Sequence, residues 1–164
     1  MDVIGQEGRP VLPLPEFGIL IASGRDNAKF LQAQLTNDID KLSQDRTMMA
    51  AWCDPKGRTL ALFTLCRIGD DIALVAPRTV IEQHLPRLRM YVLRAKVTLV
   101  PSTDRVVCGV VGPSGAALLR QHLPQPPASG AAVHLDETTV LGLLGDQRWL
   151  LICSRDAPPA WISA

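Results

Sequence analysis

The sequence predicts an α+β fold built from two related units, with mainly antiparallel sheets and a truncated second unit. Apolar runs of strand length are separated by turn signals and by short helical segments, which is typical of this fold class. The same order of elements recurs at an offset of 88 residues, as a duplicated unit requires. The matching positions are Gly24, Ala28, Leu31, Leu35 and Gly57 with Gly112, Ala116, Leu119, Leu123 and Gly145.

These observations divide the chain into three parts. We expect an extended leader over residues 1–15, a first unit over 16–103 and an incomplete second unit over 104–164. Three prolines among small and polar residues favour the extended leader. Hydrophobic residues make up 47% of the chain, which is enough for the two units to form one domain with a real core.

The first unit begins with an expected strand over 17–22. A helix-start signal at Ser23 and apolar residues at spacings of three and four predict a helix of about three turns over 25–35. The polar residues 36–38 end this helix and cap a short second helix that includes Ile39.

Three strands follow as a meander, over 48–53, 58–68 and 72–76. The first two pair across Asp54-Pro55-Lys56-Gly57, a turn whose proline and glycine suit its two corners. Gly69-Asp70-Asp71 reverses the chain again before the third strand.

A helix and a strand complete the first unit, and most of the pattern then repeats. Pro77 suits the first position of the helix, and Pro86 is expected to break or restart it. The expected elements after it are strands over 97–100 and 105–111, a helix over 114–123, and strands over 139–144 and 148–153. Residues 156–159 have the composition of the next helix start, and nothing after them matches the end of the first unit.

Three segments together resemble a known family. They are residues 30–38, the hairpin 52–63 with Asp54-Pro55-Lys56-Gly57-Arg58 at its tip, and residues 88–97. In this order they resemble the YgfZ-type folate-binding proteins, which support iron–sulfur cluster maturation and are related to the glycine-cleavage T-protein. The resemblance runs from about residue 17 to 97. It implies a duplicated folate-binding fold whose two units enclose a channel for tetrahydrofolate.

Two departures shape the expected function. The Lys-Gly-Cys-x-x-Gly-Gln-Glu motif of YgfZ-type proteins is absent, so the resemblance concerns their N-terminal portion. The aspartate pair that follows the hairpin glycine in the T-protein is replaced by Thr59-Leu60-Ala61, which cannot move a proton. We therefore expect a non-catalytic or weakly catalytic folate-binding protein, active in iron–sulfur cluster assembly or repair and in one-carbon metabolism. The alternatives are a T-protein-like aminomethyltransferase and a folate-fold domain used only for protein interaction.

Seven residues are the candidate folate site. The resemblance and the basic cluster after the second helix select Asp54, Lys56, Arg58, Arg89, Tyr91, Arg94 and Lys96. Guanidinium groups match the carboxylates of a folate, whereas the alternative is a solvated helix end whose cations complement the helix dipole. The single tyrosine would stack on a pterin or anchor its helix to the sheet. Ordinary turn chemistry is the alternative for the hairpin tip.

Other classes of function are disfavoured. With 17 basic and 16 acidic side chains and 4% aromatic residues, the chain has neither the field nor the stacking surface typical of nucleic-acid binding. Four isolated cysteines and three unrelated histidines give no metal-ligand spacing. The N-terminal segment lacks a signal-peptide pattern and the apolar runs are too short for a membrane span. We expect a cytoplasmic protein that binds no metal, membrane or nucleic acid and whose protein partners are iron–sulfur clients or assembly factors.

Overall fold

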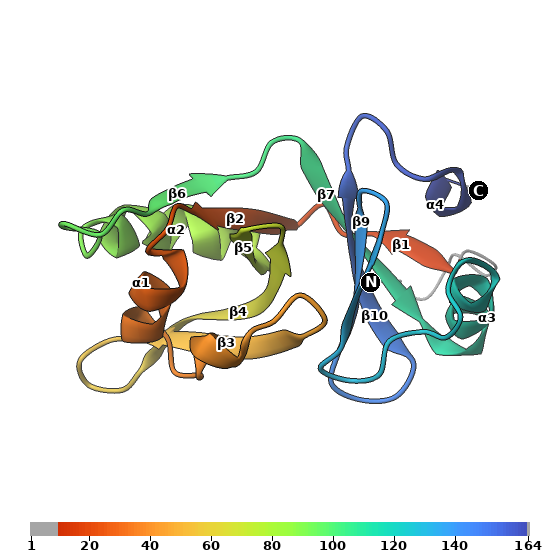
Figure 1. Cartoon of the computed structure of the whole chain (residues 1–164), viewed down its shortest axis with the longest axis horizontal. Coiled ribbons are helices and arrows are strands. Elements are labelled where there is room, and N and C mark those ends of the chain that lie inside the picture. Colours follow the sequence, from red (N-terminus) through yellow and green to blue (C-terminus); the bar gives the residue numbers. More distant parts are fainter. Residues whose placement is uncertain (1–9, 164) are drawn as a thin grey trace, which may run out of the picture.

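Two five-stranded antiparallel sheets lie between two groups of helices. The computed structural model describes residues 10–163. Helices α1 and α2 cover one side of the first sheet, the second sheet lies across the other side, and α3 and α4 lie beyond the second sheet (Figure 1). Over the described part of the chain, no helix has the length and apolar character that a bilayer crossing requires.

The first sheet has the strand order β3-β4-β5-β2-β6. Its strands are β2 (Phe17–Ser23), β3 (Thr47–Cys53), β4 (Thr59–Ile68), β5 (Asp71–Pro77) and β6 (Thr98–Pro101). The helices of this half are α1 (Asn27–Gln34), the short 3-10 helix η1 (Ile39–Lys41) and α2 (Arg78–Arg89). Because side chains alternate along a strand, Leu20, Leu65 and Leu74 face the helices while Ile19, Cys66 and Val75 face the second sheet.

The second sheet repeats this arrangement with the order β8-β9-β10-β7-β1. Its strands are β1 (Val11–Pro13), β7 (Arg105–Val111), β8 (Ala132–Leu135), β9 (Thr138–Gly142) and β10 (Arg148–Ser154). The helices are α3 (Gly112–His122) and α4 (Ala160–Ser163). Trp161 of α4 stacks on His122 of α3, with 4.8 Å between the ring centroids.

The two halves exchange their outermost strands. β1 precedes β2 along the chain but pairs with β7 of the second sheet, whereas β6 precedes β7 but pairs with β2 of the first. Val11 lies opposite Val110, and Leu99 lies opposite Ala22. Leu99 is 88 residues after Val11, and Val110 is 88 residues after Ala22, so the two pairs are equivalent. The exchange follows the duplicated sequence residue by residue.

Apolar side chains from both sheets fill the space between them. Ile19, Ala73 and Val75 of the first sheet pack against Leu150 and Ile152 of the second, and all five are almost fully buried. Burying large apolar side chains stabilises a fold by about 1.5–3 kcal/mol each. The interface between the sheets is therefore a core shared by both halves.

The expected duplication is confirmed. α1 follows β2 as α3 follows β7, and the four strands β3-β4-β5-β2 have the counterparts β8-β9-β10-β7 in the same order. The positive φ angles of Gly24 and Gly112, +106° and +74°, also recur at the 88-residue offset. The antiparallel meander, strand 105–111 and the helix after it are found where the sequence predicts them.

Other expectations require correction. Gly57 lies in the β3–β4 turn, whereas Gly145 lies in the β9–β10 turn, so these two glycines are not equivalent. The hairpin of the second half is shorter. Ala73 pairs with Ile21, and its counterpart Leu150 pairs with Gly109. The sequence offset between equivalent residues has therefore fallen from 88 to 77 at these strands. Strand β8 was not predicted, because it has only 4 residues and shows no clear alternation of apolar and polar side chains.

Local details also differ from the prediction. The first helix has 8 residues, just over two turns, because Leu35 already bridges to Trp52. α2 continues through Pro86 to Arg89 instead of breaking. Within the expected extended leader, residues 11–13 form β1 and pair with β7 of the second sheet, and residues 1–9 lie outside the described part. No counterpart of β6 was expected in the second unit. In the structure β1 takes that place, at the edge of the second sheet beside β7.

The close approach of the β2–α1 loop to the start of β6 gives a stability prediction. Gly24 has a positive φ, and a Cβ there would overlap the carbonyl oxygen of Lys96. Gly57 also has a positive φ, but open space surrounds it. We expect Gly24→Ala to lower the free energy of unfolding by about 3 kcal/mol and Gly57→Ala by about 1 kcal/mol, measured by urea unfolding. Equal losses would contradict the tight contact.

Candidate functional site

A cavity of about 300 Å³ opens where the two sheets meet. We call it the inter-sheet cavity. Strands β3 and β4 form one wall, and the end of β9 with the loop that follows forms the other. The lining residues are Asn37, Thr47, Met48, Met49, Thr64, Gly130, Gly142, Leu143 and Leu144. They come from both halves, so the cavity exists only because the sheets pack together.

The β3–β4 hairpin extends beyond the part of the first sheet that the second sheet covers. Apolar side chains on this part of the hairpin are therefore exposed beside the cavity. Met49 lies opposite Thr64 in the register and shares its face. Along β4 this face changes from buried Cys66 to Leu62, which is 50% exposed. Leu144 on the opposite wall is 69% exposed. Exposed apolar side chains gathered around one hollow are typical of binding sites.

Backbone hydrogen bonds hold the two walls at a fixed separation. The amide of Thr47 donates to the carbonyl of Gly130 at 3.0 Å, and the amide of Ala132 donates to the carbonyl of Asp45 at 2.8 Å. A ring nitrogen of His134 lies 2.9 Å from the carbonyl oxygen of Gln44. The start of β3 is thereby fastened to the start of β8, so we expect the cavity to be preformed.

Most polar groups of the lining are already used. The side-chain amide of Asn37 donates to the carbonyl of Met49, and its oxygen accepts from the amide of Asp38. The hydroxyl of Thr47 donates to the carbonyl of Leu65 at 2.8 Å. Among the described residues, the Thr64 hydroxyl has no hydrogen-bond partner. The lining contains no carboxylate, so it offers flat apolar contact with few polar groups.

The predicted hairpin-tip residues form a self-contained turn. Oδ1 of Asp54 accepts from the amides of Lys56 and Arg58 at 2.9 and 3.0 Å. Its Oδ2 accepts from the guanidinium of Arg58 at 2.7 Å. These bonds, first of all the one from the Arg58 amide, lower the pKa of the Asp54 carboxyl. Asp54 and Arg58 are therefore occupied with each other, whereas Lys56 is exposed and its side chain makes no ion pair within residues 10–163.

The helix α2 reaches the hairpin through Trp52, which sequence analysis did not select. The ring of Tyr91 meets that of Trp52 edge-on at 6.4 Å, and His84 does so at 5.9 Å. The guanidinium of Arg87 lies 5.8 Å from the indole centroid. The structure thus brings the two predicted segments together, in an arrangement where Tyr91 anchors the helix. Apolar residues at 52 and 85 were the signal for this contact, but their partners could not be read from spacing.

The remaining predicted cations are spread over the end of α2 and the following loop. Nε of Arg89 donates to the carbonyl of Leu99 at 3.0 Å, which fastens α2 to β6. The backbone amide of Lys96 donates to Asp26. Arg94 and Lys96 are exposed, and no hydrogen bond of their side chains occurs among the described residues. None of the seven predicted residues lines the inter-sheet cavity.

The cysteines are mostly core residues. Cys66, Cys108 and Cys153 are buried, whereas Cys53 is partly exposed. Burial raises the pKa of the Cys66 thiol to about 12. Within residues 10–163 there is no group of three or more His, Cys, Asp or Glu side chains placed to hold a metal ion.

Comparison with known proteins adds the family. The model of the GCVT N-terminal domain family matches residues 12–142. The tRNA-modifying protein YgfZ of Escherichia fergusonii is 31% identical over 131 residues, which are 80% of this chain and 40% of that protein. An Escherichia coli protein of the same name is 32% identical over the same lengths. The chain thus spans about two fifths of these curated relatives.

Solved structures share the fold at low sequence identity. The glycine cleavage system aminomethyltransferase T from Bartonella henselae matches with a TM-score of 0.74 and 15% identity, over 87% of this chain and 41% of that one. A heterotetrameric sarcosine oxidase from Corynebacterium sp. U-96 matches with a TM-score of 0.56 and 15% identity, over 88% of this chain and 74% of that one. The predicted T-protein type of fold is confirmed.

The hairpin tip gives a pH prediction. The carboxyl of Asp54 has a pKa below its ordinary value of 3.8, so its bonds stabilise the tip at neutral pH and are lost as the pH falls through the lowered pKa. We expect Asp54→Ala to lower the thermal unfolding midpoint at neutral pH, by a difference that shrinks as the pH falls below 3.8. Asp40→Ala, at an exposed carboxylate, is the control. A difference independent of pH would contradict the role of the carboxylate.

Proposed function

The chain belongs to the GCVT N-terminal domain family, and on that premise we propose that it is a folate-binding module of the YgfZ type. Its ligand would be a tetrahydrofolate, which carries one-carbon units when bound. Its wider role would lie in iron–sulfur cluster assembly or repair in the cytoplasm. The tRNA modification for which the relatives are named is the process that this role would serve.

The inter-sheet cavity is the observation that carries the proposal. A tetrahydrofolate has a flat pyrimidinone ring fused to a puckered saturated ring, and these are joined to an aromatic ring. The ring faces need apolar contact surfaces. Met49, Leu143 and Leu144 supply such surfaces, and methionine adapts well to flat rings. The volume of about 300 Å³ is at the lower end of small-molecule sites. We propose that these residues form one wall of the folate site.

The polar edge of a pterin requires more than this wall. Its amino and ring N–H groups are best matched by a carboxylate, and none lines the cavity. The match of 131 residues covers 40% of the curated relatives, so these are about twice as long as this chain. We propose that the partner of this edge comes from sequence beyond the part that this chain shares with them. The role of the cavity residues is then to position the rings and exclude water.

Catalysis of aminomethyl transfer finds little support. That reaction needs an ionisable group to move protons at the folate. Ala61 is buried under α2, Leu60 is half-buried, and neither can ionise. We therefore keep the binding function as the proposal and the transferase as the alternative. Dependence of product formation on the full set of T-protein substrates would favour the alternative.

The seven residues selected from the sequence stay a separate proposal for the folate carboxylates. Lys56, Arg94 and Lys96 are exposed cations, whereas Arg58 and Arg89 already donate to protein groups. Leu62 and Met49 form an apolar strip on the hairpin face between the cavity and the tip. If a folate followed this strip, its carboxylates would approach Lys56.

Two methionines allow a matched test of folate binding. Met49 lines the inter-sheet cavity and is 39% exposed, whereas Met90 at the end of α2 is 74% exposed. A carboxylate placed on the apolar wall would cost about 1–3 kcal/mol of binding free energy. We expect calorimetric titration with 5-formyltetrahydrofolate to show binding that Met49→Asp weakens by about tenfold or more. Met90→Asp should leave the affinity unchanged.

The outcomes against the proposal are distinct. Absence of binding to the unmodified chain would refute the folate-binding function. Binding that Met90→Asp weakens and Met49→Asp does not would place the folate at the end of α2 and not in the inter-sheet cavity. Thermal unfolding of each variant separates loss of binding from loss of folding.

A further inference from the structure

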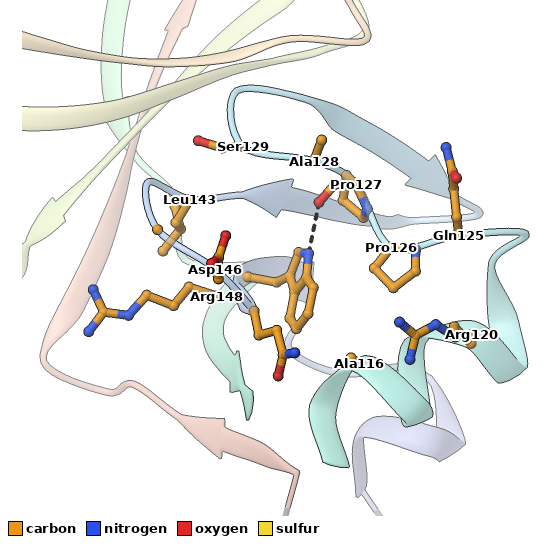
Figure 2. Close-up of a pocket in the computed structure, with 13 residues that line it drawn as sticks. Ala116, Arg120, Gln125, Pro126, Pro127, Ala128, Ser129, Leu143, Asp146 and Arg148 are labelled. Atoms are coloured by element: carbon orange, nitrogen blue, oxygen red, sulfur yellow. Dashed lines mark hydrogen bonds between the residues drawn. The ribbon is translucent and has the colours of Figure 1, made fainter. Parts of the chain in front are cut away.

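A second cavity of about 440 Å³ lies in the second half of the chain, between α3 and the turn that joins β9 to β10 (Figure 2). We call it the β9–β10 cavity. The indole of Trp149 lines it and is fixed by a 2.9 Å hydrogen bond from Nε1 to the carbonyl of Pro127. Arg120 on α3 and Arg148 at the start of β10 contribute to its walls. Neither the expected site nor the family resemblance includes these residues.

The β9–β10 cavity adjoins the inter-sheet cavity. Leu143 lines both, and the next residue, Leu144, lines the inter-sheet cavity. Gly145 and Asp146 then line the β9–β10 cavity as the turn continues. A ligand that extended from the inter-sheet cavity over Leu143 would therefore reach the β9–β10 cavity.

The charged groups of the β9–β10 cavity are available. Within residues 10–163, neither Arg120 nor Arg148 takes part in an ion pair or a side-chain hydrogen bond, whereas Arg58 pairs with Asp54 and Arg89 donates to Leu99. In Figure 2 the two arginine side chains extend in opposite directions, with Arg148 on the side of Leu143 and Arg120 on the side of Pro126. Asp146 is the single carboxylate of the lining, so the ionisable side chains carry a net positive charge.

The separation of the two guanidinium groups decides the chemistry of the ligand. Two arginines that converge on one point suit a single phosphate or carboxylate, which they bind with paired hydrogen bonds. Arginines on opposite sides of a cavity suit an extended chain that carries several carboxylates. Gln125 also lines the cavity, and an amide can bond such a chain.

We infer that the β9–β10 cavity binds the poly-γ-glutamate tail of a folate whose rings lie in the inter-sheet cavity. This inference rests on the proposed function. Arg148 would meet the carboxylates nearest the rings and Arg120 those farther along the tail. The sequence-based proposal sends the carboxylates to Lys56, Arg94 and Lys96 instead, so the two assignments make opposite predictions.

The test compares ligands that differ only in tail length. Calorimetric titration of the chain with monoglutamyl and with triglutamyl 5-formyltetrahydrofolate measures the gain in affinity from the added glutamates. We expect a gain of about tenfold at low salt, which shrinks as ionic strength rises because the charges are partly exposed. Arg148→Gln and Arg120→Gln should each reduce the ratio of triglutamyl to monoglutamyl affinity by about threefold or more.

Two further variants sharpen the test. Asp146→Asn removes the repelling carboxylate, so we expect it to increase the gain from the added glutamates. Arg25→Gln removes an exposed arginine of the first half that lines neither cavity, and we expect it to change nothing. Thermal unfolding of all variants checks that each remains folded.

Each outcome separates the two claims. If neither ligand binds, the proposed function and this inference both fail. If the monoglutamate binds and the added glutamates give no gain in affinity, this inference fails and the folate-binding function stands. The same holds if Arg94→Gln and Lys96→Gln remove the gain while Arg148→Gln and Arg120→Gln keep it. Loss of the gain in the Arg148 and Arg120 variants alone supports it.

Discussion

The exchange of β1 and β6 between the sheets constrains the rest of the molecule. Each edge strand is supplied by the chain segment that precedes the other half, so neither sheet is complete on its own. The exchange sets the two sheets face to face, and the apolar interface that includes Ile19, Val75 and Ile152 keeps them there. The inter-sheet cavity and its hydrogen-bonded rim depend on this packing, because both walls must be held at once.

The same packing explains which side chains are free to act. Groups that hold the scaffold are already bonded, as with Asp54 and Arg58 in the hairpin tip and Arg89 against β6. Apolar groups stay exposed where the hairpin extends past the second sheet, at Met49 and Leu62. Thus the inter-sheet cavity offers apolar surface, and within residues 10–163 Arg120 and Arg148 of the neighbouring β9–β10 cavity make no ion pair.

Much of the fold was predictable, and less of the candidate site. Periodicity and turn residues located most strands, and the glycine at 24 and its counterpart at 112 revealed the duplication, because their backbone geometry recurs. The exchange of β1 was not predictable, since three residues carry no signal for their partner strand. The inter-sheet cavity was missed because its lining comes from segments almost 100 residues apart, and the basic residues near Tyr91 drew attention to the end of α2 instead.

The methyl groups of the methionines test the central claim, that folate rings lie between the two sheets. Met49 lines the inter-sheet cavity, whereas Met90 is exposed at the end of α2 among the cations selected from the sequence. In NMR spectra of the methyl-labelled chain titrated with 5-formyltetrahydrofolate, ring currents of a bound ligand should shift the Met49 signal and leave Met90 in place. A shift of Met90 with Met49 unchanged would contradict this account.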